Sequence, residues 1–566
     1  MTFLKVAIDA PLDTLFDYLP PAEGPLPAPG SRVRVPFGRR RPVGLVMAHA
    51  AESTLPPERL KPVLEVLDAT PLVDRSLLRL LARTASYYQA PPGVVMAAAI
   101  PAPLRQGRPV PEPPSRIVAR GPAPEAMRRR APKQAALLDL LAAGPRRTDD
   151  PGLPAGWRAG AGRLAARGLL EIEPEPPAAA WTAAAAGPGL TGAQRAAVDE
   201  ILAGLGRFAP RLLFGVTGSG KTEVYLEAAA ECLRRGLQVL VLVPEIGLTP
   251  QLVQRFGTRL AAPVAVLHSG LTGGDRLAAW DDARTGRAAV VIGTRSAAFV
   301  PLARPGLVVV DEEHDPSLRQ HEGLRYSGRD LAVLRGRLEG VPVVLGSATP
   351  SLETLRHARE GRYALSRLPE RPGASTHPRV SLVDLRRHPA VEGLSAPLLA
   401  SMQAHLDADG QVLLFLNRRG FAPALFCSSC GWVAGCRHCD ARYTWHRRAA
   451  RLRCHHCGDE SGLPAACPDC GADLRPAGEG TERLEDALQR RFPGVPIARI
   501  DRDSTRRRGA VDRILDDVRE GRTRILVGTQ MMAKGHDFPG VTLVGVINAD
   551  QGLFGTDFRA GERLAQ

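Results

Sequence analysis

Short apolar runs that alternate with helical segments dominate the chain from residue 190 onward. A first series of six runs is followed by a second series of four: 212–214, 239–243, 264–267, 290–292, 307–310 and 343–345, then 412–416, 497–500, 525–527 and 541–547. Strands that alternate with helices predict a parallel, doubly wound sheet, and two series predict two such lobes. We expect the first lobe to span residues 190–372 and the second to span residues 373–566.

A different pattern marks residues 1–104, which we expect to form a β-rich domain. The tetrapeptide Arg-Val-Arg-Val at residues 32–35 predicts a strand with arginine on one face and valine on the other. A basic turn follows at residues 38–41, and residues 43–46 return as a second strand. The arginine face is either a surface that contacts phosphate or a solvated strand face, and the sequence favours neither.

Residues 105–189 are rich in proline, alanine and arginine, and they contain two stretches with helical spacing, 133–141 and 163–172. Two short helices of this kind are typical of a winged-helix-like domain, a fold that serves DNA binding, protein contacts or spacing. Residues 174–189 have the composition of a linker.

The net charge of the chain is +15, which suits a polyanionic partner because each cation near a phosphate releases a counterion. A compositional bias explains the same charge, since only five of the 74 basic residues are lysine. Two of these five, Lys221 and Lys534, lie in candidate catalytic motifs. The chain has no apolar run near the ~18–20 residues that cross a bilayer, and its N-terminus lacks a secretory signal pattern. We therefore expect a cytoplasmic protein with no membrane partner.

Residues 215–222 match the phosphate-loop pattern G-x-x-x-x-G-K-[ST], between an apolar strand and a predicted helix. The glycines let backbone N–H groups face phosphate, and the helix N-terminus adds a favourable partial charge. Lys221 would reach the β and γ phosphates, and Thr222 would bind Mg²⁺. The predicted nucleotide-binding residues of this loop are Gly215, Gly218, Ser219, Gly220, Lys221 and Thr222.

The acidic tetrapeptide Asp311-Glu312-Glu313-His314 follows an apolar strand and supplies the second part of the predicted nucleotide site. A carboxylate at the C-terminal end of a buried parallel strand lies beside the phosphate loop in such a fold. Asp311 would hold Mg²⁺, directly or through water, and Glu312 would orient and deprotonate the attacking water. The predicted catalytic residues are therefore Lys221, Asp311 and Glu312.

Three further strand ends carry small or hydroxyl residues, at 244–246, 293–296 and 346–350. Hydroxyls and backbone amides in such loops hold DNA phosphates without reading bases. We therefore predict DNA contacts at Thr294 and Arg295, and a role for Ser347 and Thr349 in coupling hydrolysis to motion. In the second lobe, residues 480–483 precede a helix and residues 528–538 follow a strand. In this order, the segments resemble the motifs of superfamily 2 helicases.

Eight of the nine cysteines form four C-x-x-C pairs, which indicates metal binding. Four pairs make two four-thiolate sites, and three pairings are possible. We favour the nested pairing, because joining the first two pairs leaves only residues 431–435 between them. The inner site then contains Cys436, Cys439, Cys454 and Cys457, and the outer site contains Cys427, Cys430, Cys467 and Cys470.

Zinc suits a closed, redox-inert site of four sulfurs, so we expect two Zn²⁺ ions, with an iron–sulfur cluster as the second choice. His446, His455 and His456 lie nearby, but eight cysteines already satisfy two sites, so these histidines are expected in solvent. The insert, residues 424–476, has few apolar residues and would need its metal to fold.

The sequence resembles the PriA family of primosomal replication-restart helicases over nearly its whole length. Its most specific segments are residues 215–222, 311–315 and 346–354, and Asn417-Arg418-Arg419-Gly420 running into the cysteines. The resemblance implies a multidomain α/β protein with two RecA-like lobes. It implies an ATP-dependent 3′-to-5′ DNA helicase that recognises stalled or repaired forks and initiates primosome assembly.

The same resemblance implies cofactors, partners and a DNA-end pocket. ATP and Mg²⁺ are the implied cofactors; forked and single-stranded DNA, single-stranded DNA-binding protein and replicative helicase-loading factors are the implied partners. The N-terminal domain of the family is thought to bind the 3′ end of a nascent leading strand. The matching residues are Phe16, Asp17, Gly38 and Lys61. The ring of Phe16 would stack on a terminal base, and the carboxylate of Asp17 would accept a hydrogen bond from a terminal hydroxyl.

Members of the family continue beyond residues 559–563 into a Gln-x-x-Gly-Arg-x-Gly-Arg segment, whose arginines stabilise the transition state. The sequence stops at Gln566, so we expect a truncated second lobe without this segment or a C-terminal domain, and Lys534, Arg559 and Arg563 are not assumed to replace it. This departure leaves a second hypothesis, an ATPase-poor fork-binding primosome scaffold without helicase activity. A third hypothesis, a zinc-ribbon transcription or RNA factor, leaves the two-lobe motif order unexplained.

Overall fold

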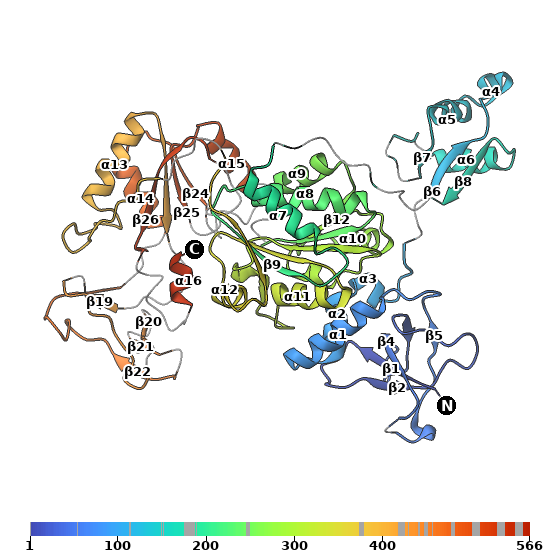
Figure 1. Cartoon of the computed structure of the whole chain (residues 1–566), viewed down its shortest axis with the longest axis horizontal. Helices are drawn as coiled ribbons and strands as arrows, with labels where there is room; N and C mark the ends of the chain where they lie inside the picture. The colour runs from blue at the N-terminus through green and yellow to red at the C-terminus, as the bar shows by residue number, and fades with distance from the viewer. Residues whose placement is uncertain are drawn as a thin grey trace. The chain divides into compact units, whose positions relative to one another are not determined.

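The computed structural model of the chain divides into two compact units. Figure 1 shows its helices and strands, coloured from the N-terminus to the C-terminus. The first unit contains Met1–Ala348 and His357–Arg371, and the second contains Thr349–Arg356 and Pro372–Gln566. The structure describes residues 2–53, 55–111, 115–148, 150, 152–154, 156–174, 181, 187, 189–244, 250–372, 378–416, 425–427, 429–439, 442–446, 451–454, 457–476, 481–500, 510–528, 538–549 and 559–565.

The first unit begins with a five-stranded antiparallel sheet in the order β2-β1-β4-β3-β5. Its strands are β1 (Phe3–Ile8), β2 (Phe16–Tyr18), β3 (Arg32–Arg34), β4 (Val43–Ala50) and β5 (Glu65–Val66). The predicted return of the chain after the basic turn is confirmed, because β4 pairs with β3 in antiparallel register. The apolar faces of these strands form a small core of their own around Val6, Val33 and Val46.

The arginine face predicted for residues 32–35 is wrong at Arg32. This side chain is buried, and its guanidinium donates to both carboxylate oxygens of Asp68 at 2.7–3.2 Å and to the carbonyls of Leu104 and Arg108 at 2.7 and 2.8 Å. Arg32 therefore ties the sheet to the chain that follows it, because burial of a cation requires that its donors be satisfied. Arg34 lies nearer the surface, where it pairs with Glu65.

A short 3₁₀ turn, η1 (Pro57–Arg59), lies between β4 and β5. Three helices follow the sheet and join it to the first parallel-sheet lobe: α1 (Arg75–Tyr88), α2 (Pro92–Ala99) and α3 (Ala102–Arg105). Their apolar residues belong to the same core cluster as residues of that lobe. Polar bonds reinforce the junction, since Trp280 Nε1 donates to the Ala99 carbonyl at 3.0 Å and the Ser327 N–H donates to the Tyr88 hydroxyl at 3.1 Å. The helices and the lobe therefore share one continuous hydrophobic core.

A small separate core lies within residues 115–174. Its elements are β6 (Ser115–Ala119), α4 (Glu125–Arg130), α5 (Pro132–Ala142), β7 (Arg146–Arg147), α6 (Trp157–Ala165) and β8 (Leu170–Pro174), with sheet order β7-β6-β8. The prediction of helix at 133–141 is confirmed, but helix throughout 163–172 is wrong. The helix ends before Gly168, which has a φ of 68°, and residues 170–174 pair with β6 as a strand.

The first lobe is a seven-stranded sheet in the order β11-β12-β10-β13-β16-β9-β17, with every pair parallel. Its strands are β9 (Pro210–Gly215), β10 (Gln238–Leu242), β11 (Val264–Leu267), β12 (Val290–Gly293), β13 (Pro305–Val310), β16 (Val343–Ser347) and β17 (Ala364–Leu368). The six predicted strands and the parallel arrangement are confirmed. The sequence does not predict the edge strand β17, because three of its five residues are exposed and it contains no apolar run.

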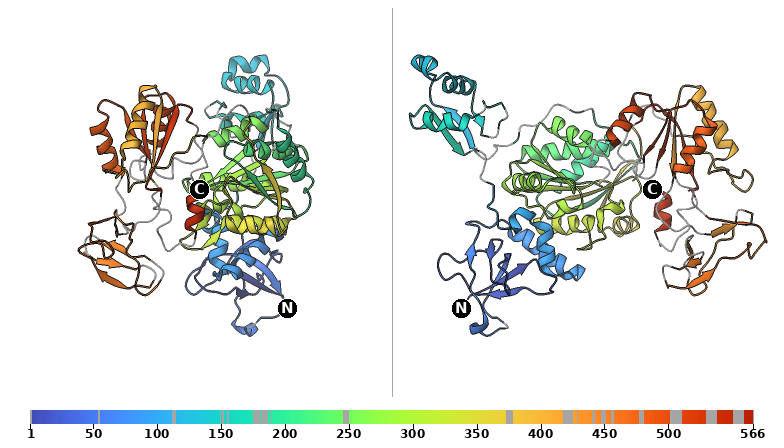
Figure 2. Two further views of the ribbon diagram at one scale, coloured as in Figure 1. Left: turned by 60° about the vertical axis from the view of Figure 1, so that its left-hand side comes forward. Right: turned by 180° about the vertical axis from the view of Figure 1, so that it is seen from behind.

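Helices cover both faces of this sheet (Figure 2). Side chains of α7 (Gly192–Leu202), α8 (Lys221–Arg234) and α9 (Pro250–Leu260) share a core with Val239 and Val241 of β10. Leu240 and Leu242 point into the other core, with α10 (Gly273–Thr285) and α11 (Gly328–Glu339). The remaining elements of the region are η3 (Arg295–Phe299), η4 (Pro316–Leu318), β14 (Arg319–Gln320), β15 (Tyr326–Ser327) and α12 (Leu352–Arg359).

The second unit contains a four-stranded parallel sheet in the order β24-β25-β18-β26, which confirms the second series of strands. Its elements are α13 (Ala396–Asp407), β18 (Gln411–Leu416), α14 (Thr481–Arg491), β24 (Ile497–Ile500), α15 (Ala510–Arg519), β25 (Ile525–Gly528), β26 (Val541–Ile547) and α16 (Ala560–Ala565). Between β18 and α14 lie five short strands: β19 (Leu425–Cys427), β20 (Thr444–His446), β21 (Arg451–Arg453), β22 (Glu460–Gly462) and β23 (Leu474–Pro476).

A search of the described residues for a membrane-crossing helix found none of sufficient length and apolarity.

The buried Arg32–Asp68 pair yields a prediction about stability. Asp68→Ala leaves the Arg32 charge buried without its carboxylate, so the free energy of unfolding of the N-terminal domain should fall by about 3–5 kcal/mol. Glu65→Ala removes the exposed partner of Arg34 and should cost under about 1 kcal/mol. Hydrogen exchange of the β3 and β4 amides measures the loss of stability in each variant. Equal protection of these amides in the two variants would contradict the structural role of Arg32.

Candidate functional site

The phosphate-loop segment lies between β9 and α8, at the carboxyl edge of the first parallel sheet. Gly218 and Gly220 have φ values of 81° and 79°, in the left-handed region that favours glycine. A side chain at Gly215 would overlap the Ser219 hydroxyl. The three glycines therefore allow the loop to fold tightly against the start of α8.

Two side chains of this loop have polar groups directed at its interior. The Lys221 ammonium is buried and donates to the carbonyl of Gly215 at 3.1 Å. The Ser219 hydroxyl is buried and lacks a hydrogen-bond partner among the residues that the structure describes. Thr222 follows in the first turn of α8, half-buried. A cation, an unpartnered hydroxyl and a helix N-terminus suit a bound phosphate group.

Sequence reasoning missed Gln194, which supports the loop from outside. Thr191 and Gln194 form a reciprocal capping box at the start of α7, and the Gln194 amide donates to the Ser219 carbonyl at 2.8 Å. Gln194 is buried, and its side-chain amide is held in place by its hydrogen bonds to Thr191 and Ser219. The spacing Thr-x-x-Gln before an apolar run is a capping signal that predicts the helix start, although not its contact with the loop.

Asp311 directly follows β13, which is separated from β9 in the sheet by β16 alone. Asp311 therefore lies at the same edge of the sheet as the phosphate loop. Its N–H donates to the Leu242 carbonyl at 2.9 Å, and its carboxylate accepts the Tyr225 hydroxyl at 3.0 Å. Burial raises the pKa of Asp311, and the nearby Lys221 ammonium lowers it. Lys221 therefore lies near enough to Asp311 for its charge to affect the carboxylate.

Gly346 makes the contact between Tyr225 and Asp311 possible. A Cβ at this position of β16 would overlap the Tyr225 hydroxyl and lie 3.5 Å from Asp311 Oδ1. Tyr225 is one turn after Lys221 on α8, and its pKa is raised well above the usual value by burial and by the nearby Asp311 carboxylate. Tyr225 therefore remains a neutral donor to the acid. Sequence reasoning did not identify this tyrosine.

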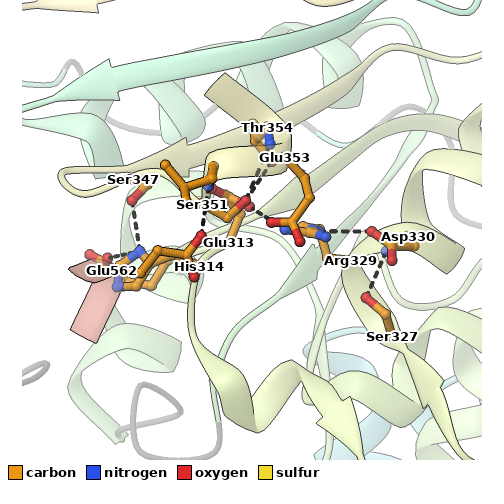
Figure 3. Close-up of polar contacts among 12 residues, drawn as sticks. Glu313, His314, Ser327, Arg329, Asp330, Ser347, Ser351, Glu353, Thr354 and Glu562 are labelled. Atoms are coloured by element: carbon orange, nitrogen blue, oxygen red, sulfur yellow. Dashed lines mark hydrogen bonds and ion pairs between the residues drawn. The ribbon is translucent and has the colours of Figure 1, made fainter. Parts of the chain in front are cut away.

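Glu312 has a φ of 47°, a left-handed conformation that is uncommon outside glycine. Its side chain lies 3.6 Å from His314 Nδ1, and His314 Nδ1 shares a hydrogen bond of 2.7 Å with the Ser347 hydroxyl (Figure 3). The acidic segment is thus bonded to the end of β16. The next acid, Glu313, is buried and pairs with Arg329 of α11 at 3.1 Å.

The two predicted DNA-contacting residues after β12 have different environments. Thr294 is buried, and its N–H donates to the Leu267 carbonyl at 3.1 Å. Arg295 is half-buried and donates to the Ser317 carbonyl at 2.9 Å and to the Gln320 side chain. Arg295 therefore joins η3 to the β14 segment. Of residues 244–246, only Pro244 lies within the described residues.

The residues of the predicted DNA-end pocket have different environments in the N-terminal domain. The rings of Phe16 and Phe37 meet edge to face, with centroids 5.0 Å apart, and Gly38 follows in a turn with a φ of 59°. The Lys61 carbonyl accepts the N–H of Leu19, three residues after Phe16. Asp17 is not free, because Lys5 Nζ lies 2.6 Å from one of its oxygens and the Ser53 hydroxyl donates to the other at 2.6 Å.

The eight clustered cysteines form two groups of four, each with all Sγ atoms within 4.8 Å of one another. The outer group is Cys427, Cys430, Cys467 and Cys470, and the inner group is Cys436, Cys439, Cys454 and Cys457. This grouping coincides with the nested pairing. The closest sulfur pairs are 3.5–3.6 Å apart, close to the ~3.8 Å expected between sulfurs bound tetrahedrally at ~2.3 Å from zinc.

Three of the four cysteine turns share one backbone pattern. Gly431, Gly458 and Gly471 directly follow the second cysteine and have φ values of 72–83°. Each donates its N–H to the carbonyl of the first cysteine at 2.9–3.0 Å. At the first turn, the N–H groups of Cys430 and Ser429 lower the pKa of Cys427 to about 6, which favours the thiolate that binds metal. His455 and His456 lie outside the described residues.

Several other sequence-predicted segments lie outside the described residues, namely 417–420, Gly480 and 529–537 with Lys534. Arg559 is described, and it pairs with Glu353 and with Glu562, the latter at 2.9 Å. Glu562 also accepts the N–H of Leu352 at the start of α12, at 2.7 Å.

Comparison with protein families matches four parts of the chain. Residues 5–101 match a 3′DNA-binding domain (3′BD), and residues 191–358 match the DEAD/DEAH box helicase domain. Residues 436–461 match the PriA DNA helicase Cys-rich region (CRR) domain, and residues 478–561 match the helicase conserved C-terminal domain.

Comparison with individual proteins gives long matches to replication restart proteins PriA. The Haemophilus influenzae protein is 44% identical over 585 residues, covering 100% of this chain and 79% of that protein. The Treponema pallidum protein is 36% identical over 571 residues, covering 99% of this chain and 76% of that protein. The Bacillus subtilis protein is 43% identical over 383 residues, covering 67% of this chain and 48% of that protein.

The identity extends over the antiparallel N-terminal sheet, the phosphate-loop lobe, the cysteine groups and the second parallel sheet. The chain belongs to the PriA family of replication restart proteins, ATP-dependent DNA helicases of superfamily 2.

Proposed function

We propose that this chain couples ATP hydrolysis to 3′-to-5′ movement on DNA and acts at stalled or repaired replication forks, where it initiates primosome assembly. The observation that carries this proposal is the convergence of Lys221 and Asp311. Lys221 opens α8 and Asp311 directly follows β13, yet the Lys221 charge acts on the Asp311 carboxylate, and Tyr225, four residues after Lys221, donates a hydrogen bond to it. A scaffold without motor activity would need neither the buried Lys221 cation nor the half-buried Asp311 acid beside it.

Each residue of this site has a proposed role. Lys221, Ser219 and the loop N–H groups bind phosphate, and Thr222 and Asp311 hold Mg²⁺, which neutralises charge on the phosphates when bound. Glu312 orients the attacking water and accepts its proton. Because Glu312 lies 3.6 Å from His314, which is hydrogen-bonded to Ser347 at the end of β16, we propose that these contacts relate the acid to the DNA-binding loops.

The cysteine groups are proposed to hold one Zn²⁺ ion each, as structural sites. Four sulfurs in each group would fill all four coordination positions of a zinc ion. No position would remain open for a substrate, which distinguishes such sites from catalytic zinc. The core beneath them is small, with Leu425, Tyr443 and Leu452 among its few members. Binding of metal therefore supplies much of the free energy that folds residues 424–476.

DNA is proposed to contact the protein at two places. Phe16, Asp17, Gly38 and Lys61 would receive the 3′ end, where Lys5 and Ser53 already orient the Asp17 carboxylate. Thr294 and Arg295 would contact the strand on which the motor moves. By family membership, single-stranded DNA-binding protein and helicase-loading factors are the proposed partners, and work on chromosomal forks implies a cytoplasmic location.

We propose four domains. The β-rich N-terminal domain spans residues 1–104, the winged-helix-like domain with its linker spans 105–189, the first helicase lobe spans 190–372 and the second lobe spans 373–566.

Lys221→Ala tests the motor directly. The substitution removes the cation that binds phosphate, so DNA-stimulated ATP hydrolysis should fall at least about 100-fold, while binding of forked DNA in the absence of ATP persists. The measurement is phosphate release with and without single-stranded DNA. Equal, negligible rates for the parent and the variant would reject the motor function for this chain.

Tyr225→Phe tests the support of Asp311. The ring still fills its buried position, but the carboxylate loses a hydrogen bond, so the ATPase rate should fall roughly tenfold and more Mg²⁺ should be needed for half-maximal rate. Tyr326→Phe makes the same chemical change at another buried tyrosine of the lobe and should leave both quantities unchanged. A Tyr225→Phe protein with the parent's rate and Mg²⁺ dependence would remove Tyr225 from the mechanism.

Cys454→Ser tests the metal content. Loss of one inner thiolate should reduce bound zinc from two to one ion per chain, measured by elemental analysis of the purified protein. Cys232→Ala removes the buried thiol of α8, outside both groups, and should leave two. Iron in place of zinc, or no metal in the parent chain, would contradict this proposal.

A further inference from the structure

Helix α1 has an exposed face that carries only positive charge. Arg75, Arg79 and Arg83 succeed one another at intervals of four residues, and Tyr87 continues the series. All four are exposed, and 78% of the surface of Tyr87 is open to solvent. We call these four residues the α1 stripe.

The three arginines of the α1 stripe are unpaired. Within the described part of the chain, no ion pair or side-chain hydrogen bond involves Arg75, Arg79 or Arg83. The helix itself contains no acidic residue, and Asp74, which precedes it, caps the helix by accepting the Leu77 N–H at 2.9 Å. By contrast, the exposed Arg235 pairs with Glu231 of α8.

This arrangement disfavours the isolated helix. Like charges four residues apart repel each other, and a cation in the first turn, such as Arg75, opposes the helix dipole. A bound anion would reverse both effects. Unrelieved repulsion of this kind on an otherwise well-capped helix is expected where a ligand supplies the missing negative charge.

The dimensions of the stripe suit a single nucleic-acid strand. Four residues of helix rise ~6 Å, so the three arginines stand in a regular row along the helix. Such a row suits the phosphates of a single strand, whose bases are free to stack on an aromatic ring. Tyr87 offers that ring at the end of the stripe, held edge to face by Tyr88 with centroids 4.9 Å apart.

The stripe also ends at the motor lobe. Tyr88 accepts the N–H of Ser327, the residue that caps α11, and α1 shares a hydrophobic core with α11. A strand on the stripe would therefore lie on a helix that is fixed to the lobe containing the phosphate loop. We propose that the α1 stripe is a binding site for single-stranded DNA, distinct from the pocket for the 3′ end, in which the arginines bind successive phosphates and Tyr87 stacks on a base.

A circular single strand tests this site, because it has no 3′ end for the pocket to bind. The 566-residue chain would be titrated against a fluorescent circular oligothymidylate without ATP, at several salt concentrations. Arg75→Gln/Arg79→Gln/Arg83→Gln should weaken binding at least tenfold at low salt and reduce the slope of log affinity against log salt by about 2, since each single-strand phosphate contact contributes ~0.7.

Matched variants separate the stripe from general charge. Arg207→Gln/Arg337→Gln/Arg359→Gln removes three exposed arginines elsewhere in the first unit and should change the affinity less than about twofold. Tyr87→Ala should weaken binding roughly fivefold without changing the salt slope, and Tyr87→Trp should restore it. Lys221→Ala should bind the circle as the parent does, so failure of the motor and failure of the stripe are distinguishable.

Specific results would overturn the proposal. One is an unchanged salt slope in the triple stripe variant while thermal unfolding shows an intact fold. Another is an equal loss of affinity in the two triple variants. A stripe variant that loses binding only to duplex DNA, or only to an acidic peptide, would assign the surface to that partner instead.

Discussion

The proposed nucleotide site depends on a half-buried carboxylate, Asp311, that lies near a buried cation, Lys221. In a parallel sheet, the strand ends that carry these groups meet at one edge, so β9, β13 and β16 bring the phosphate loop, the acid and Gly346 together. Burial raises the pKa of the Asp311 carboxyl, and the Lys221 charge opposes that shift. Tyr225 adds a neutral donor, and it fits only because residue 346 lacks a side chain.

Sequence patterns were sufficient for those features that depend on local spacing. Apolar runs predict the six strands of the first lobe, and the phosphate-loop spacing predicts glycines at positions where φ is positive, as at Gly218 and Gly220. The cysteine spacing fixes which thiols are close in the chain, and the length of the intervening segments favours the nested groups. In each case, the chemistry is contained in a few neighbouring residues.

Features that depend on distant contacts were not visible in the sequence. Alternation at residues 32–35 indicates a strand, but nothing near Arg32 shows that Asp68 and the Leu104 carbonyl will enclose it. The segment 170–174 has an apolar content that also suits a helix, and only its pairing with β6 makes it a strand. Tyr225 and Gln194 likewise acquire their roles from residues 86 and 25 positions away, Asp311 and Ser219.

The N-terminal domain and the first lobe are linked by packing rather than by a flexible tether. Apolar residues of α1 and α2 belong to the core that also contains Leu240 of β10 and Leu331 of α11. Arg329, in the first turn of α11, pairs with Glu313, two residues after Asp311. A rigid shift of α1 must therefore displace either α11 or its ion pair, because a packed core transmits strain instead of absorbing it. Any DNA that binds the N-terminal domain at α1 thus acts on α11, which directly contacts the acidic segment of the proposed ATP site.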